Sequence, residues 1–220
     1  MRWRSLFTSV STLHAVEDRL VEMLRLDQRS YDLAHQALFD RGNVTELRTE
    51  ISDTDHQVNL AVQDVRQQLL VHASVSQSLA DMPAMFTYLS VVKDIERIGD
   101  DAKNILEIAH ARTGRIEVGI LTDLTDHGDR IADLLGQVIT IFADRDPDHA
   151  RRLLEDSTPT LAELDRLVDE LTVAPGPGYA AVPRALYYRY LKRIASHLHD
   201  VLSSLVAPVD RLGYYQPENR

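Results

Sequence analysis

Residues 94–104 read Asp-Ile-Glu-Arg-Ile-Gly-Asp-Asp-Ala-Lys-Asn, the densest polar cluster of the 220-residue chain. The apolar residues Ile95, Ile98 and Ile105 recur at helical spacing through and just beyond this cluster. Upstream, Pro83 stands where a proline is tolerated in the first turn of a helix. The stretch therefore predicts one long amphipathic helix from about Pro83 to Ala111.

The sequence on either side predicts five more helices. Only 9 Gly and 8 Pro occur, and long stretches contain neither, which favours helices over many short strands. We expect further helices at about 10–39, 43–72, 121–144, 147–173 and 183–205, with an irregular tail from residue 208. Asn43 with Glu46 forms a capping-box pattern, and Asp146 precedes a first-turn proline.

The predicted fold class is thus all-α, with three helices in residues 1–113 and three in residues 114–220. An offset of 96 residues places Ile95 over Leu191 and Arg97 over Arg193. These matches suggest an internal repeat of the two halves. They are short, however, and any two amphipathic helices share some apolar positions by chance. An internal duplication and a chance similarity therefore both stay open.

Composition excludes several classes of protein. The net charge is −10, from 34 acidic and 24 basic residues, and no basic run offers a nucleic-acid-binding face. The absence of cysteine rules out disulfides, thiolate nucleophiles and cysteine-based zinc sites. No apolar run reaches the length of about 20 residues that spans a bilayer. We expect a soluble, cytoplasmic protein, peripheral to a membrane at most and without catalytic activity, since no phosphate loop or metalloprotease motif occurs.

Two polar strips could carry chemistry. Glu96, Asp100 and Asn104 are spaced i, i+4 and i+8, so they share one helix face, and Asp94 belongs to the same cluster. On the preceding helix, Asp55 and Asn59 are again spaced i, i+4 and could face the first strip. Carboxylates on facing helices are how helical bundles build metal sites, although most acidic residues on helices are solvated surface charges.

Two carboxylates one turn apart repel each other unless a cation neutralises them. That cation could be Arg97, Lys103, a residue on a neighbouring helix, or a metal ion. Oxygen-only ligands favour hard ions such as Mg²⁺, Ca²⁺, Mn²⁺ or ferric iron. Gly99 lies in the middle of the helix, where glycine costs about 1 kcal/mol relative to alanine, and indicates a close approach of another helix.

Residues 96–105, Glu-Arg-Ile-Gly-Asp-Asp-Ala-Lys-Asn-Ile, resemble the signature helix of the PhoU family, which repeats a phrase of the form E-R-I-G-D-x-A-x-N-I in each half. Residues 55–59, Asp-His-Gln-Val-Asn, resemble the family's D-x-x-V-N/D phrase on the preceding helix. Length, helix layout and the placement of both phrases agree with the family, so the resemblance covers essentially the whole chain.

The resemblance implies two tandem three-helix bundles, each able to hold a multinuclear cluster of iron, zinc, manganese or magnesium. In the first bundle it implies six metal-site residues: Asp55, Asn59, Asp94, Glu96, Asp100 and Asn104. It further implies a homodimeric negative regulator of phosphate uptake and phosphate signalling. Its partners would be a phosphate ABC transporter and a sensor histidine kinase, or a sodium-phosphate symporter in place of the ABC transporter.

The second half departs from the family pattern. Lys192 stands where the signature Glu is expected, and Ala195, Ser196 and Asp200 replace Gly, Asp and Asn. On the fifth predicted helix the acids Asp165 and Asp169 remain at i, i+4 spacing, but Leu161 occupies the place of a third. A lysine beside a metal site repels the cation. We therefore expect the second site to be lost or reduced, with Asp165, Asp169 and Asp200 as its weaker candidates.

Two alternatives to a metal-binding regulator follow from the residues. His197 and His199 are two positions apart, on opposite sides of a helix, and so are poor co-ligands. A ferritin-like di-metal oxidase needs paired Glu-x-x-His motifs, and Glu107 with His110 is a single instance without a match. The other alternative is a helical scaffold or adaptor that holds no metal. The altered motif of the second half favours this alternative.

Overall fold

The computed structural model describes residues 2–39, 44–76, 78–111, 118–176 and 178–212, and these form six α-helices with no strand among them. The helices are α1 (Arg2–Phe39), α2 (Val44–Ser76), α3 (Met82–Ala111), α4 (Val118–Asp144), α5 (Pro147–Val173) and α6 (Gly178–Ser203). Two short 3₁₀-helices, η1 (Leu79–Asp81) and η2 (Val209–Arg211), precede α3 and follow α6. The predicted all-α class is confirmed.

Three predicted helix ends were wrong. Helix α1 begins at Arg2 instead of near residue 10, and α2 continues to Ser76 instead of ending near His72. Residues 73–76 contain no glycine or proline, and the Ser74 hydroxyl bonds back to the Leu70 carbonyl inside the helix. Helix α6 begins at Gly178, five residues before Pro183, and this proline inside the helix removes one backbone hydrogen bond, the one that an N–H at this position would make to the Tyr179 carbonyl.

The predicted cap of the fifth helix is confirmed. One carboxylate oxygen of Asp146, Oδ1, accepts hydrogen bonds from the backbone N–H groups of Asp148 at 3.1 Å and His149 at 2.9 Å. This satisfies two of the donors that every helix start leaves free. The predicted cap Asn43 and the predicted boundary after residue 113 lie outside the described residues, so both stay predictions.

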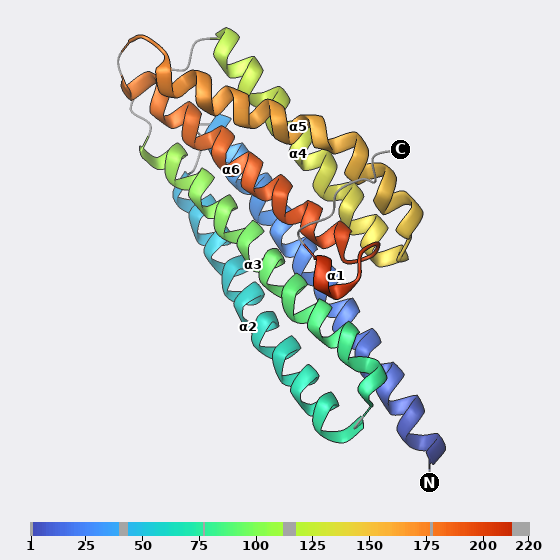
Figure 1. Ribbon diagram of the computed structural model, residues 1–220. Helices are drawn as coiled ribbons and strands as arrows, with labels where there is room; N and C mark the ends of the chain where they lie inside the picture. The colour runs from blue at the N-terminus through green and yellow to red at the C-terminus, as the bar shows by residue number, and fades with distance from the viewer. Residues whose placement is uncertain (1, 40–43, 77, 112–117, 177, 213–220) are drawn as a thin grey trace.

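The six helices pack as two sets of three (Figure 1). Helix α1 lies against α2 and α3, and α6 lies against α4 and α5. The sets meet where α1 contacts α4 and where α3 contacts α6. The buried apolar side chains form one continuous cluster that draws on all six helices. Because the core is shared, the α3–α6 contact is the place where polar residues of both halves can meet.

The α1–α4 contact is tight at Gly128. The Tyr31 hydroxyl donates a hydrogen bond of 2.8 Å to the Gly128 carbonyl. A methyl group on Gly128 would overlap the side chains of His35 and Tyr187, so only glycine fits there. Among the described residues, no helix combines the length and the apolar composition needed to cross a membrane.

Candidate functional site

The structure brings the predicted acids of α2 and α3 together around one lysine. Lys103 Nζ lies 2.6 Å from Asp55 Oδ1 on α2 and 2.8 Å from Asp100 Oδ1 on its own helix. Lys103, one of the cations expected from the sequence, therefore neutralises the two carboxylates across the α2–α3 pair. Desolvation lowers the pKa of Lys103, but its hydrogen bonds and charge attraction to both acids outweigh this and raise the pKa.

The other residues of the two strips make contacts within their own helices. Glu96 forms an ion pair of 2.6 Å with Lys93 one turn earlier. The Asn59 amide donates to Asp55 at 3.3 Å, and the Asn104 amide donates to Asp101 at 3.4 Å. These contacts leave carboxylate and amide oxygens of both strips at the surface between α2 and α3. Their role as metal ligands stays a prediction.

A buried acid that sequence reasoning missed lies behind these strips. Asp27 on α1 is fully buried, and neither of its carboxylate oxygens has a hydrogen-bond partner. Burial raises its pKa well above the ordinary value, and the charges of Asp100 and Asp55 raise the pKa further. A methyl group on Gly99 would lie 2.6 Å from Asp27 Oδ1, so the mid-helix glycine makes room for this carboxylate.

The signal for Asp27 was present in the sequence. It interrupts the apolar stripe of α1, following Met23 and Leu24 at helical spacing and preceding Tyr31 by one turn. An acid on the buried face of a helix is rare unless it has a partner, and buried unpaired oxygens call for a proton, a water or a cation. Lys103 already pairs with Asp55 and Asp100, and the ligand atoms of Asp27, Asp55 and Asp100 would have to move closer together to hold one of the hard metal ions that the family resemblance implies.

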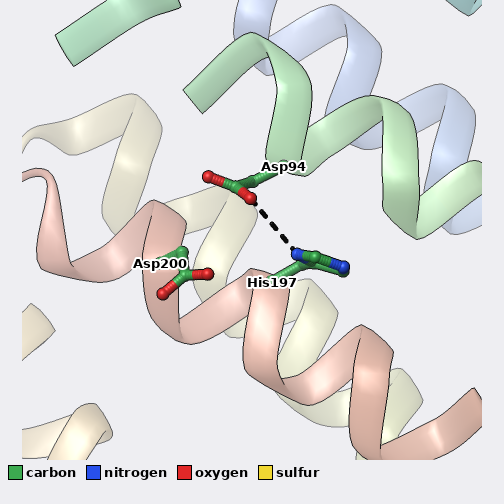
Figure 2. Close-up of side chains that lie close together, drawn as sticks. All are labelled: Asp94, His197 and Asp200. Carbon is green, nitrogen blue, oxygen red and sulfur yellow. Dashed lines mark hydrogen bonds and ion pairs between the residues drawn. The ribbon is translucent and has the colours of Figure 1, made fainter. Parts of the chain in front are cut away.

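Asp94 lies on a different face of α3 from the predicted strip. It points toward α6, where its Oδ1 lies 3.2 Å from His197 Nδ1 (Figure 2). Asp200, one turn after His197, completes a group whose candidate ligand atoms all lie within 4.8 Å of one another. In the described part of the chain, no other set of three acidic or histidine side chains meets this condition. The structure thus joins one candidate from each half with a histidine that sequence reasoning set aside.

A second polar contact crosses the same helix pair. Arg193 Nε donates to Asp101 Oδ2 at 3.0 Å, and the Asp101 side chain is fully buried. Asp94 and Asp101 are seven residues apart on one face of α3, and their partners His197 and Arg193 follow in the reverse order on α6. The two helices therefore run antiparallel, and two acid–base pairs hold the halves in register.

The weaker second-half candidates do not come together. Lys192 Nζ lies 3.1 Å from Asp165 Oδ2, so the lysine that replaces the signature Glu pairs with an acid of the α5 strip. Asp169 is exposed on α5. Only Asp200 of the three joins a group, and it does so with Asp94 instead of the α5 acids. This arrangement gives the physical reason for expecting a reduced second strip.

The fold and the polar groups define the chain as an all-helical protein of two packed three-helix sets with acidic strips on the first set. Residues 20–109, which span most of α1 through α3, match the sequence model of the family described as PhoU domain. The first set of helices is therefore a PhoU domain.

Curated relatives and solved structures agree with this assignment. The chain is 25% identical over 196 residues to the phosphate-specific transport system accessory protein PhoU homolog of Synechocystis sp., covering 86% of this chain and 85% of the relative. A homolog of the same description from Aquifex aeolicus is 24% identical, covering 72% and 68% of the two chains.

The fold is similar to that of two crystallised proteins. PhoU from Pseudomonas aeruginosa has a TM-score of 0.74 at 20% identity, covering 89% of this chain and 95% of that one. The phosphate transport system regulatory protein PhoU from Streptococcus pneumoniae has a TM-score of 0.74 at 16% identity, covering 96% and 100%. At these identities the similarity establishes the fold.

Proposed function

We propose that this chain regulates a phosphate transport system by binding its components, without catalysing a reaction of its own. Support comes from the match of residues 20–109 to the PhoU domain and from similar curated proteins that are named as accessory proteins of phosphate-specific transport systems. The match extends over most of both chains in the Synechocystis homolog, so the similarity is not confined to one shared segment.

An exposed apolar surface at the end of the α2–α3 hairpin is the proposed contact with the transporter. Leu70 and Val75 at the end of α2 are 68% and 70% exposed, Leu79 in η1 is 85% exposed, and Phe86 at the start of α3 is 53% exposed. Monomeric proteins rarely gather large apolar side chains at the surface without a partner. The occupant would be the cytoplasmic part of a phosphate ABC transporter, with a sodium-phosphate symporter or a sensor histidine kinase as the other outcomes of the binding test.

A metal would complete the acidic strips of the first helix set. Asp27, Asp55, Glu96 and Asp100 offer the oxygen ligands, with the amide oxygens of Asn59 and Asn104 beside them. Iron, manganese, magnesium or zinc bound there would neutralise the acids and hold α1, α2 and α3 together. Lys103 pairs with Asp55 and Asp100, so a metal bound there would compete with this lysine and change the shape and charge of the surface.

Elemental mass spectrometry of the natively purified protein tests the metal part of the proposal. We expect at least about one equivalent less metal in the Glu96→Ala/Asp100→Ala double variant than in wild type, because two of the acidic ligands are then missing. Metal-free wild type after gentle purification would favour the alternative of a helical adaptor that works by docking alone. The oxidase alternative has little support, since Glu107 of the single Glu-x-x-His motif is exposed and pairs with Arg48 at 2.9 Å.

Uptake of radiolabelled phosphate tests the regulatory role. Cells lacking the gene should take up phosphate without normal repression, and the wild-type gene should restore control. Phe86→Glu should fail to restore control while keeping a native circular dichroism spectrum. Leu60→Glu is the matched control, because Leu60 is 48% exposed on α2 but lies away from the hairpin end. Full control by Phe86→Glu would refute the docking surface, and normal uptake in the deleted strain would refute the regulatory role.

A further inference from the structure

The contact between α3 and α6 assembles a ligand set that neither half contains alone. Asp94 comes from the first set of helices, and His197 and Asp200 come from the second (Figure 2). His197 and Asp200 are spaced i, i+3, so they present their side chains on the same face of α6. Each residue offers one ligand atom, and the three atoms lie within 4.8 Å of one another.

We propose that Asp94, His197 and Asp200 form a mononuclear site for a divalent transition-metal ion that bridges the two halves of the chain. This site is separate from the acidic strips of α2 and α3, and the proposal does not depend on the role in phosphate transport. It would hold α3 and α6 together at the point where the halves meet.

The separation of the ligand atoms suits such an ion. A tetrahedral ion with bonds of about 2.1 Å places its ligand atoms about 3.4 Å apart. His197 Nδ1 and Asp94 Oδ1 are already 3.2 Å apart. The Asp200 carboxylate, within 4.8 Å of both, needs to approach by about an ångström, which a change of its side-chain torsions can supply.

The protein itself leaves negative charge unmatched at this place. The described residues give the Asp200 carboxylate no hydrogen bond or ion pair. Arg97 Nη1 stays 3.7 Å from Asp94 Oδ1, beyond hydrogen-bonding distance, and its side chain is 48% exposed. Arg193 is engaged with the buried Asp101. A cation between the two carboxylates would supply the missing positive charge without displacing either arginine.

The donor set selects the kind of metal. One imidazole nitrogen with two carboxylate oxygens suits Zn²⁺, Mn²⁺ or Fe²⁺, whereas Ca²⁺ and Mg²⁺ prefer oxygen ligands throughout. Three protein ligands leave at least one coordination position for water or a further ligand. The site is only partly shielded, with 12% of the Asp94 side chain and 13% of the His197 side chain exposed, so an ion can enter from solvent.

The test is a titration of full-length protein, stripped with EDTA and dialysed, with Zn²⁺ and separately with Mg²⁺ by isothermal calorimetry. We expect Zn²⁺ binding that the Glu96→Ala/Asp100→Ala variant retains and that Asp200→Asn weakens at least about tenfold. Thermal melting provides a second readout. Zn²⁺ at about a hundredfold excess over Kd should raise Tm by about 5–10 °C in wild type and by much less in Asp200→Asn.

Asp200→Asn keeps the shape of the side chain, so a folding defect is not expected. In the Glu96→Ala/Asp100→Ala background, where the acidic strips no longer compete for Zn²⁺, His197→Ala should abolish binding. His199→Ala is its control on the same helix, because His199 hydrogen-bonds to Ser157 on α5 at 2.7 Å, away from Asp94. Equal Zn²⁺ affinity in wild type, Asp200→Asn and His197→Ala would overturn the proposal. The proposal would also be overturned if wild type bound no Zn²⁺ at 0.1 mM, a concentration on the order of the Kd of the weakest specific sites. Loss of all Zn²⁺ binding in the Glu96→Ala/Asp100→Ala variant alone would overturn it as well.

Discussion

The glycine in the middle of α3 gives the most direct test of how the first helix set is packed. Alanine is normally favoured over glycine inside a helix by about 1 kcal/mol. At Gly99, however, the added methyl carbon would lie 2.6 Å from Asp27 Oδ1 and 3.6 Å from its Cγ. The Asp27 side chain is fully buried and cannot swing into solvent, and such overpacking costs about 1–3 kcal/mol. Gly99→Ala should therefore lower the free energy of unfolding by up to about 2 kcal/mol.

Alanine substitutions at two other glycines should change stability less favourably and more favourably than Gly99→Ala, and so serve as comparisons. A methyl group on Gly136 in α4 would meet only Gln28 Nε2 at 3.5 Å, an ordinary contact, so Gly136→Ala should raise stability by about 1 kcal/mol. At Gly128 the methyl group would overlap His35 and Tyr187 together, and Gly128→Ala should be the most destabilising of the three.

The assay is urea denaturation followed by far-UV circular dichroism, with EDTA present so that bound metal does not contribute. The Asp27→Ala/Gly99→Ala double variant should recover the loss, because it removes the atom that the methyl group meets and also the unpaired carboxylate. The coupling between the two sites should be about 1–3 kcal/mol. If Gly99→Ala is as stabilising as Gly136→Ala, the Asp27 carboxylate does not lie beside Gly99, and the description of a buried acid behind the strips is wrong.

The remaining predictions concern buried charged groups. Burial raises the pKa of the Asp27 carboxyl. The stability that this group contributes is therefore complete below about pH 4 and is lost as the pH rises through the folded pKa. Asp27→Ala should reduce the resulting fall in the free energy of unfolding, measured by urea denaturation between about pH 4 and 8. Burial lowers the pKa of His199 to about 4, so its contribution to stability has the opposite pH dependence. It is present above about pH 6.5 and is lost as the pH falls toward about 4. His199→Leu should remove up to about 3 kcal/mol of that acid sensitivity, and an unchanged pH profile would contradict the buried neutral imidazole. Arg193→Ala leaves the buried Asp101 without its cation and should cost about 1–3 kcal/mol, whereas Arg97→Ala, at an exposed position, should cost less than about 0.5 kcal/mol; equal losses in thermal melts would argue against the Arg193–Asp101 pair.

Helix number and helix order could be read from the sequence because they depend on local properties. Apolar residues at helical spacing, few glycines and prolines, and the Asp146 cap are each contained within a turn or two of chain. Helix ends were less predictable, because residues 73–76 and 178–182 could be helical or not on local grounds and packing of the neighbouring turns extends the helix. The pairing of Asp100 with Lys103 was also within reach, since Lys103 was one of the cations expected there, but the pairing of Glu96 with Lys93 was missed.

The sequence by itself determined the all-helical class, the resemblance to the PhoU family and the acidic strips, because each rests on spacing along a single helix. Only the tertiary structure decided which residues meet between helices. Asp27 lies behind the acids of α2 and α3 because α1 packs over Gly99. Asp94 is separated from Glu96 because the two residues point from different faces of α3. Asp94 joined His197 and Asp200, some 100 residues away, because α3 and α6 lie antiparallel in contact. The period of a helix gives the direction of a side chain, but the partner it meets depends on how the helices pack.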